Sequence, residues 1–252
     1  GATDILRDAI LALDPVVASK AVFANTAVDR IVPGAATTPG LDVTVEAFFE
    51  WAIESGPFRG SPPDIPEAHF VDDLAPYIER KLFTVNTGHA TAAYHGLVAG
   101  HSSIADAMAD PAVVAEVRAV LDETKTLLVA KHEFDADVQQ AYLEKNLVRF
   151  ANPYLEDTVD RVGRQPLRKL SRNERFIGPA SQLAERGLPA DALLRTVGAA
   201  LAFDVPEDPQ SVEMLELLRT TAADEFVSRV TGLENDHPLF RPLVAVVAAH
   251  QK

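Results

Sequence analysis

The sequence contains no cysteine, which excludes disulfide bonds, a thiolate nucleophile and a zinc site with cysteine ligands. No apolar run approaches the roughly 20 residues that a membrane-spanning helix requires. Positive charge is scarce, because 23 Lys and Arg oppose 37 Asp and Glu, which gives a net charge of −14. Proteins that bind nucleic acids or anionic membranes need the opposite balance on the contacting face. We therefore expect a cytoplasmic protein with neither a nucleic-acid partner nor a membrane partner.

Two further patterns are missing. None of the 13 glycines forms a Gly-x-Gly pair, so the sequence contains neither a dinucleotide-binding fingerprint nor a phosphate loop. His89, His95 and His101 follow one another at intervals of six residues. Each step of six turns a helix by about 240°, so the three imidazoles cannot converge on one ion. We expect no metal cofactor.

The residues that are present predict a mixed first part and a helical remainder. Asp4 to Leu13 has the apolar spacing of a helix, whereas Ala21 to Ala24 and Leu41 to Val45 have the character of short strands. The proline-rich segments Pro33 to Gly40 and Ser55 to Pro66 predict loops without regular structure. The pattern after these loops, from about residue 70, predicts helices.

Several helix boundaries are marked by residue type. Asp110-Pro111 and Asp208-Pro209 each combine an N-cap with a proline at the first helical position. Ser171 to Glu174 has the spacing of a capping box. Gly187 and Gly232 stand where a left-handed residue would end a helix.

Lys81, Asn86 and His89 place an amine, an amide and an imidazole within nine residues. If this segment is an α-helix, the three side chains border one cleft, and Gly88 leaves a space above Lys81 for a substrate. The amine could take a proton from an alcohol, while the amide and the imidazole hold its oxygen and orient a hydroxyl. The spacing also fits a surface lysine, a turn asparagine and a core histidine.

A basic segment follows later in the chain. Between Arg161 and Arg175 the sequence RVGRQPLRKLSRNER holds six basic residues and one acid, Glu174. Clustered guanidinium groups are suited to gripping a phosphate or a carboxylate with two hydrogen bonds. A solvated helix face paired with acidic neighbours is an equally good interpretation of the pattern.

Four segments together resemble the polyol-specific long-chain dehydrogenase family, in the order of that family and across nearly the whole chain. They are FANTAVDRIVP from Phe23, VTVEAFFEWAI from Val43, ERKLFTVNTGHA from Glu79 and NPYLEDTVDRVGRQPLRKL from Asn152. The resemblance implies a mainly α fold. Its multi-helical substrate domain is similar to the C-terminal domain of the 6-phosphogluconate dehydrogenase superfamily, and a short α/β remnant of a Rossmann domain precedes it. We expect residues 1–46 to be the remnant and residues 47–252 to be the substrate-binding and catalytic domain.

The resemblance also implies the chemistry, which is metal-independent oxidation of a sugar alcohol with NAD. Lys81 matches the general base of the family, and Asn25 and Asn86 match the two asparagines of its oxyanion hole. His89 matches the histidine that contacts the substrate hydroxyls. Family members begin with a glycine-rich Rossmann turn. Since the chain has no such turn, we expect the NAD-binding domain to be absent from it.

The basic segment matches the part of the family that binds the far end of the substrate. Arg161 and Lys169 fit a pair that contacts the polyol, and Arg164, Arg168 and Arg172 are the candidates for binding a phosphate on it. The resemblance does not say which of these three touches the phosphate.

One departure separates the branches of the family. Members that oxidise free mannitol have an acidic residue three positions before the lysine, where this chain has Ile78. This favours the branch that interconverts mannitol 1-phosphate and fructose 6-phosphate. The alternatives are a family member that acts on free mannitol or a hexuronate, and a catalytically silent module that binds a sugar phosphate or self-associates. The sequence does not indicate an oligomeric state.

Overall fold

The structure is a computed structural model that describes residues 2–32 and 43–251. Its N-terminal region contains two helices and one three-stranded sheet, in the strand order β1-β2-β3. Strand β2 pairs antiparallel with β1 and parallel with β3. The elements are α1 (Ala2–Leu13), α2 (Pro15–Ala18), β1 (Thr26–Asp29), β2 (Glu50–Glu54), a 3-10 turn η1 (Gly56–Phe58) and β3 (Ala68–Val71).

The helix expected from Asp4 is confirmed as α1, but the two expected strands are not found where the pattern placed them. Residues 21–24 have no regular structure, and neither do residues 43–45, the described part of the second segment. A strand requires a hydrogen-bonded neighbour, which alternation of side chains alone does not provide. The expected loop at 33–40 lies outside the described residues, and the loop at 55–66 contains the turn η1.

The expected helical character is confirmed from Ala75 onward, after a strand that extends to Val71. The helices are α3 (Ala75–Arg80), the π-helix η2 (Lys81–Asn86), α4 (Thr87–Val98), α5 (Ile104–Ala109), α6 (Pro111–His132), α7 (Ala136–Phe150), the 3-10 turn η3 (Pro153–Leu155), α8 (Val159–Gly163), α9 (Pro166–Lys169), α10 (Ile177–Glu185), α11 (Asp191–Leu201), α12 (Pro209–Thr220), α13 (Ala223–Thr231) and α14 (Phe240–His250).

Most of the predicted helix boundaries are confirmed. The Asp110 carboxylate accepts a backbone N–H at the start of α6, and the Asp208 carboxylate does the same for α12. Gly187 and Gly232 adopt left-handed conformations with φ of 68° and 67°. Gly232 directly follows α13, and Gly187 lies two residues after the end of α10. Glycine adopts this backbone conformation without the steric cost of a Cβ atom.

The capping box at Ser171 to Glu174 is wrong. Both residues lie in the irregular segment between α9 and α10, and α10 begins only at Ile177. The Ser171 hydroxyl donates to the carbonyl of Arg168, at the end of α9, instead of accepting an N–H of a following helix. The motif therefore closes one helix and does not open the next.

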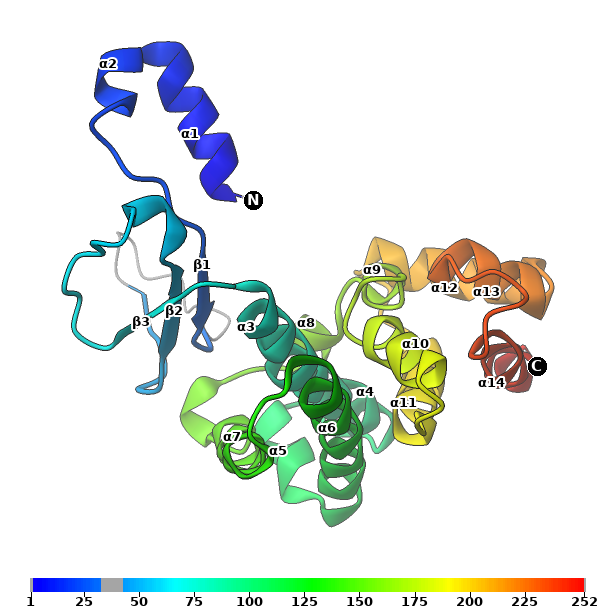
Figure 1. The fold of residues 1–252 in the computed structure, drawn as a ribbon. Helices are drawn as coiled ribbons and strands as arrows, with labels where there is room; N and C mark the ends of the chain where they lie inside the picture. The colour runs from blue at the N-terminus through cyan, green and yellow to red at the C-terminus, as the bar shows by residue number, and fades with distance from the viewer. Residues whose placement is uncertain (1, 33–42, 252) are drawn as a thin grey trace.

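Helix α4 is the centre of the helical region, where it lies against α5, α6, α8 and α11 (Figure 1). Its residues Ala90, Ala92 and Ala93 are fully buried. Such small side chains permit close helix packing. The same is true at Gly96, where an added Cβ would lie only 2.6 Å from the Cβ of Ala107 on α5. This packing gives the residues on α4 a rigid support.

The small sheet with α1 and α2 forms one end of the molecule and α12–α14 form the other (Figure 1). The predicted fold class, a mainly α protein with a short α/β part before it, is confirmed. Among residues 2–32 and 43–251, no helix is both long enough and apolar enough to cross a membrane.

Candidate active site

Lys81 and Asn86 are the first and last residues of the π-helix η2, so the α-helical geometry on which the shared cleft was conditional is not met here. A π-turn is wider than an α-turn, which changes the angles between the side chains that it carries. Thr87 stabilises the turn, because its hydroxyl lies 2.9 Å from the carbonyl oxygen of Leu82 and 2.8 Å from that of Arg175 and can donate its single proton to either or share it between them. Single π-turns inside helices occur frequently at functional sites.

The side chains of Lys81 and Asn86 are both half-buried. Within the described residues, neither the Lys81 amine nor the Asn86 amide makes a hydrogen bond or an ion pair. Neither group is among the buried polar atoms that lack a partner, so both remain accessible to solvent. These two groups are therefore free to bind a ligand.

Asn25 directly precedes β1, and β1 lies against η2. The fold thus places the strand that follows Asn25 beside the turn that ends at Asn86, although the two asparagines lie far apart in the sequence. The Asn25 side-chain amide lies 3.4 Å from the Glu54 carboxylate, a weak hydrogen bond. A substrate oxygen could replace this contact at little cost.

The space that we expected above Gly88 is not there. An added Cβ at Gly88 would lie 2.8 Å from Cε2 of Phe150 and 3.0 Å from Cδ2 of Leu121. The absence of a side chain at this position lets α4 pack against α6 and α7, and the space is filled by the protein itself. Gly88 is therefore a packing residue.

His89 lies on α4, three residues after Asn86, with a side chain that is 15% exposed. Its ring stacks on Phe150 with the planes 4° apart and the centroids 5.3 Å apart. Burial lowers the pKa of His89 to about 4, against the opposing effect of the nearby Asp157 carboxylate. The positive charges of Arg161, Arg149 and Arg175 lower the pKa further. The imidazole is consequently neutral near pH 7, and it can donate one hydrogen bond and accept another.

Arg161 extends from α8 beside His89 and is 32% exposed. Its Nε and Nη2 donate to the two carboxylate oxygens of Asp157, the second over 2.5 Å. The Nε2 atom of His89 lies 3.7 Å from Oδ2 of the same carboxylate. Asp157, a residue that sequence reasoning did not select, therefore contacts two of the predicted site residues at once. Its spacing of four residues from Arg161 was a signal for this ion pair.

Lys169 is almost completely buried and donates to the carbonyl of Arg164. Burial lowers the pKa of Lys169 to about 6, and the charges of Arg175 and Arg168 contribute in the same direction. The side chain of Arg175 is 13% exposed, and its partial burial lowers its pKa against the opposing charge of Glu174. Arg175 also lies next to the end of η2, because its carbonyl faces the Thr87 hydroxyl over 2.8 Å, although we had not selected it.

The three candidates for phosphate binding differ in their contacts. Arg168 pairs with Glu174 over 2.7 Å, and Arg172 pairs with Glu185 over 2.9 Å. The exposed guanidinium of Arg164 makes neither a hydrogen bond nor an ion pair within the described residues. Of the three, Arg164 is the one whose charge is not already matched by a carboxylate.

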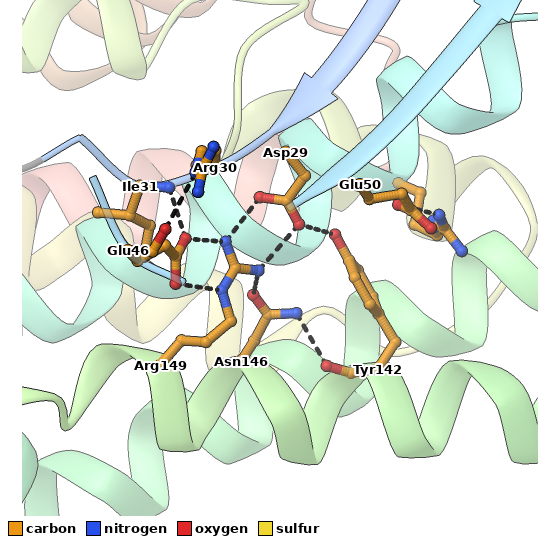
Figure 2. Close-up of polar contacts among 9 residues, drawn as sticks. Asp29, Arg30, Ile31, Glu46, Glu50, Tyr142, Asn146 and Arg149 are labelled. Carbon is orange, nitrogen blue, oxygen red and sulfur yellow. Dashed lines mark hydrogen bonds and ion pairs between the residues drawn. The ribbon is translucent and has the colours of Figure 1, made fainter. Parts of the chain in front are cut away.

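A second polar cluster, the Arg149 cluster, was not predicted from the sequence. It joins Arg149 and Tyr142 of α7 to Asp29 at the end of β1 and to Glu46 (Figure 2). Arg149 donates to both oxygens of Asp29, each over 2.8 Å, and to both oxygens of Glu46 over 2.6 and 3.0 Å. The Tyr142 hydroxyl donates to Asp29 over 2.6 Å. The cluster attaches β1, and with it Asn25, to the helical region.

The guanidinium of Arg149 is held in its charged form by the carboxylates around it. Burial alone would lower the pKa of Arg149, but the hydrogen bonds and charges of Asp29 and Glu46 outweigh it and raise the pKa above its usual range. Arg149, Asp29 and Glu46 are each at most 6% exposed. Each charged group has a hydrogen-bonding partner of opposite charge, as a buried ion requires, although two carboxylates share the one guanidinium.

A cavity of about 230 Å³ opens beside His89 and is lined by Phe150, Asn152 and Asp157 among others. A larger cavity of about 970 Å³ lies near Leu201 and Leu218 and contains none of the predicted site residues. Within the described part of the chain, no three His, Asp or Glu side chains are grouped so that they could hold a metal ion.

Comparison with known proteins gives a consistent relationship over the chain. A model of the mannitol dehydrogenase C-terminal domain matches residues 73–232, and one of the mannitol dehydrogenase Rossmann domain matches residues 2–67. The expected division after residue 46 stays a prediction. The mannitol-1-phosphate 5-dehydrogenase of Pseudarthrobacter chlorophenolicus is 60% identical over 232 residues, which are 92% of this chain and 60% of that protein. That of Neosartorya fischeri is 55% identical over 235 residues, 92% of this chain and 61% of that protein.

Solved structures show the same fold at lower identity. The ternary complex of Pseudomonas fluorescens mannitol 2-dehydrogenase with NAD and D-mannitol has a TM-score of 0.69 and 21% identity, and the match covers 91% of this chain and 51% of that one. A substrate-free D-sorbitol dehydrogenase has a TM-score of 0.67 and 18% identity, covering 98% of this chain and 57% of that one. This chain thus spans about 60% of the length of the curated relatives above. Since the C-terminal domain model matches more than half of it, the chain belongs to the mannitol dehydrogenase family.

Proposed function

We propose that this chain carries the substrate-binding and proton-accepting part of a dehydrogenase that interconverts mannitol 1-phosphate and fructose 6-phosphate with NAD(H). The observation that carries the proposal is the pair of unpartnered groups on η2, the Lys81 amine and the Asn86 amide, beside the strand that follows Asn25. The high identity to proteins named mannitol-1-phosphate 5-dehydrogenase supports the choice of substrate.

In this proposal, Lys81 accepts the proton of the substrate hydroxyl. No carboxylate of the described residues pairs with the Lys81 amine, which leaves it available for proton exchange. As the O–H bond breaks, negative charge develops on the oxygen, and the amides of Asn25 and Asn86 donate hydrogen bonds to it. Such donors stabilise the transition state more than the ground state, because the charge is larger there.

The described residues do not fit the cofactor itself. Oxidation of the alcohol also removes a hydride from the carbon that carries the reacting hydroxyl. NAD would accept this hydride when it is bound. The pyrophosphate of a dinucleotide is usually bound by a glycine-rich turn at the start of a helix. This chain has no Gly-x-Gly pair, and the three strands of its sheet are followed by no such turn. We therefore assign no NAD contact to any residue of this chain.

His89, Arg161 and Lys169 bind the remaining hydroxyls of the substrate in this proposal. The neutral imidazole of His89 can both donate and accept, which suits a hydroxyl group. The Nη1 atom of Arg161 makes no hydrogen bond within the described residues and remains available to a ligand.

Arg164 binds the phosphate group. Its guanidinium is exposed and unpaired, whereas Arg168 and Arg172 are held by Glu174 and Glu185. The carbonyl of Arg164 accepts the hydrogen bond from Lys169, which places this arginine at the same end of the site. An arginine whose charge is unmatched can grip a phosphate without first breaking an ion pair.

The experiment that tests the proposal is a comparison of substrates. The complete protein that contains this chain is purified. NADH formation is measured with mannitol 1-phosphate, with mannitol and without substrate, and NADH consumption is measured with fructuronate, a ketone that the enzyme would reduce. We expect kcat/KM to be highest for mannitol 1-phosphate. A preference for free mannitol or a hexuronate would instead assign the protein to another branch of the family, and no turnover of any polyol would refute the enzymatic proposal.

A further inference from the structure

We infer that Asp157 is a positioning residue of the site, which holds Arg161 and His89 in a fixed mutual arrangement for substrate binding. This inference rests on the proposed function. Asp157 itself touches no reacting atom in the proposal, since Lys81, Asn86 and Asn25 have that role. It acts through the two groups that it contacts.

The backbone around Asp157 is held from both sides. Its carbonyl accepts the N–H of Ile104 over 2.9 Å, and Val159 donates to the carbonyl of Ser102 over 3.1 Å. Ser103 and Thr158 form an isolated antiparallel bridge between the same two segments. The position of the Asp157 side chain is thus determined by a second segment of the chain.

The carboxylate of Asp157 is 1% exposed, and its contacts account for this burial. A buried carboxylate is costly unless charged and hydrogen-bonding partners satisfy it. Arg161 provides both with its Nε and Nη2 atoms, in a two-pronged contact that fixes the plane of the guanidinium. One side of Arg161 is therefore used for positioning, and Nη1 remains for a ligand.

The same carboxylate orients His89. Its Oδ2 lies 3.7 Å from Nε2, which is beyond hydrogen-bonding distance but close enough for a strong electrostatic effect at a buried site. A negative charge beside Nε2 favours the tautomer that carries its proton there. The Nδ1 atom is then the acceptor for a donor on the ligand. The stacking on Phe150 restricts the remaining freedom of the ring.

The test replaces Asp157 with Asn in the complete protein, which removes the charge and keeps the shape. Because His89 and Arg161 bind hydroxyls that do not react, we expect the KM for mannitol 1-phosphate to rise about tenfold or more, with kcat changed by less than about threefold. Asp160→Asn is the matched control, since this exposed acid lies in the first turn of the same helix α8. We expect it to change neither constant. Equal effects of the two substitutions would overturn the inference.

A double-mutant cycle with Arg161→Gln shows whether Asp157 acts through Arg161. We expect Asp157→Asn to raise KM by less than about threefold when Arg161 is already Gln, because contacting residues are not additive. Should Asp157→Asn alone fail to fold, the double variant removes both charges and is compared with Arg161→Gln. A further loss of about tenfold in the double variant would contradict the positioning role.

Hydrogen exchange of the Arg161 side chain, measured in the complete protein without substrate, tests the positioning role of Asp157 independently of the proposed function. In ¹H–¹⁵N NMR spectra, the Arg161 Nε–H should exchange slowly in the unmutated protein and in Asp160→Asn. It should exchange rapidly in Asp157→Asn. If the signal is unchanged in Asp157→Asn, Asp157 does not hold Arg161, whatever the enzyme assay shows. If the unmutated complete protein has no activity but this signal behaves as expected, the proposed function fails and the arrangement of the two side chains stands.

Discussion

The Lys81 region and the Arg149 cluster are both polar and partly or fully buried, but they differ in how their groups are paired. In the Arg149 cluster, one guanidinium is matched by two carboxylates, and a tyrosine hydroxyl and an amide complete the network. At η2, the amine of Lys81 and the amide of Asn86 have no partner within the described residues. Complete pairing indicates a structural role, and polar groups left without partners indicate a place for a ligand.

The two regions are also connected. Asp29, which Arg149 holds, ends the strand that begins directly after Asn25, and this strand lies against η2. The paired cluster therefore supports the position of one predicted oxyanion donor relative to the base. We expect substitutions in the Lys81 region to lower the catalytic rate and substitutions in the Arg149 cluster to lower the free energy of unfolding.

The largest expected effect is the loss of catalysis in Lys81→Ala. General-base catalysis is typically worth about 10² to 10⁴ in rate, so kcat for polyol oxidation should fall by at least about a hundredfold. The melting temperature should change little, because no contact of the amine is lost. The control is Lys20→Ala, at an exposed position. Retention of more than about a hundredth of the activity would argue against Lys81 as the base.

Arg149→Met should have the converse effect, a large loss of stability. It leaves the buried carboxylates of Asp29 and Glu46 without their cation, which typically costs about 3–5 kcal/mol. Urea unfolding followed by circular dichroism measures the change. Arg118→Met is the matched control, because its ion pair with Glu144 on α7 is exposed and is worth at most about 1 kcal/mol. If the two variants lose similar free energy of unfolding, the buried Arg149 cluster stabilises the chain no more than an exposed ion pair does.

Arg164→Ala should weaken binding of the phosphate ester selectively. A hydrogen bond to a charged group contributes about 1.5–3 kcal/mol, so the KM for mannitol 1-phosphate should rise roughly tenfold or more, with little change for free mannitol. Arg172→Ala serves as the control, since Glu185 already pairs with this arginine. If Arg172→Ala has the larger effect on the phosphate ester, the assignment of Arg164 is wrong.

Lys169→Met should change the pH dependence of stability. The pKa of Lys169 is about 6 in the folded chain and near 10.4 in an unfolded one. Between these values the unfolded chain binds the additional proton, so this lysine makes stability increase as the pH rises from about 6 toward 10. Urea midpoints measured across this range should therefore increase less in Lys169→Met than in the unmutated chain. An identical pH dependence in both would show that Lys169 is charged and solvated in the folded state.

Much of the architecture followed from local patterns. The Asp-Pro pairs at 110 and 208 and the glycines at 187 and 232 predicted helix ends correctly, because capping depends on a few adjacent residues. The strands were missed, since pairing between β1 and β2 joins segments more than 20 residues apart. The π-turn was missed as well, because the Thr87 hydroxyl beside it faces the carbonyl of Arg175, a residue 88 positions away in the sequence.

For the candidate site, the order of motifs along the chain was sufficient to recognise the family and to nominate Lys81, Asn86, His89 and the basic segment. Side-chain type and spacing carry that information, because the chemistry of an alcohol requires a base and hydrogen-bond donors. Which groups are unpaired was settled by the fold. Glu174 and Glu185 come close to Arg168 and Arg172, and Asp157 comes close to both Arg161 and His89. Burial and pairing depend on residues distant in sequence, so only the folded chain distinguishes the free guanidinium of Arg164 from its paired neighbours.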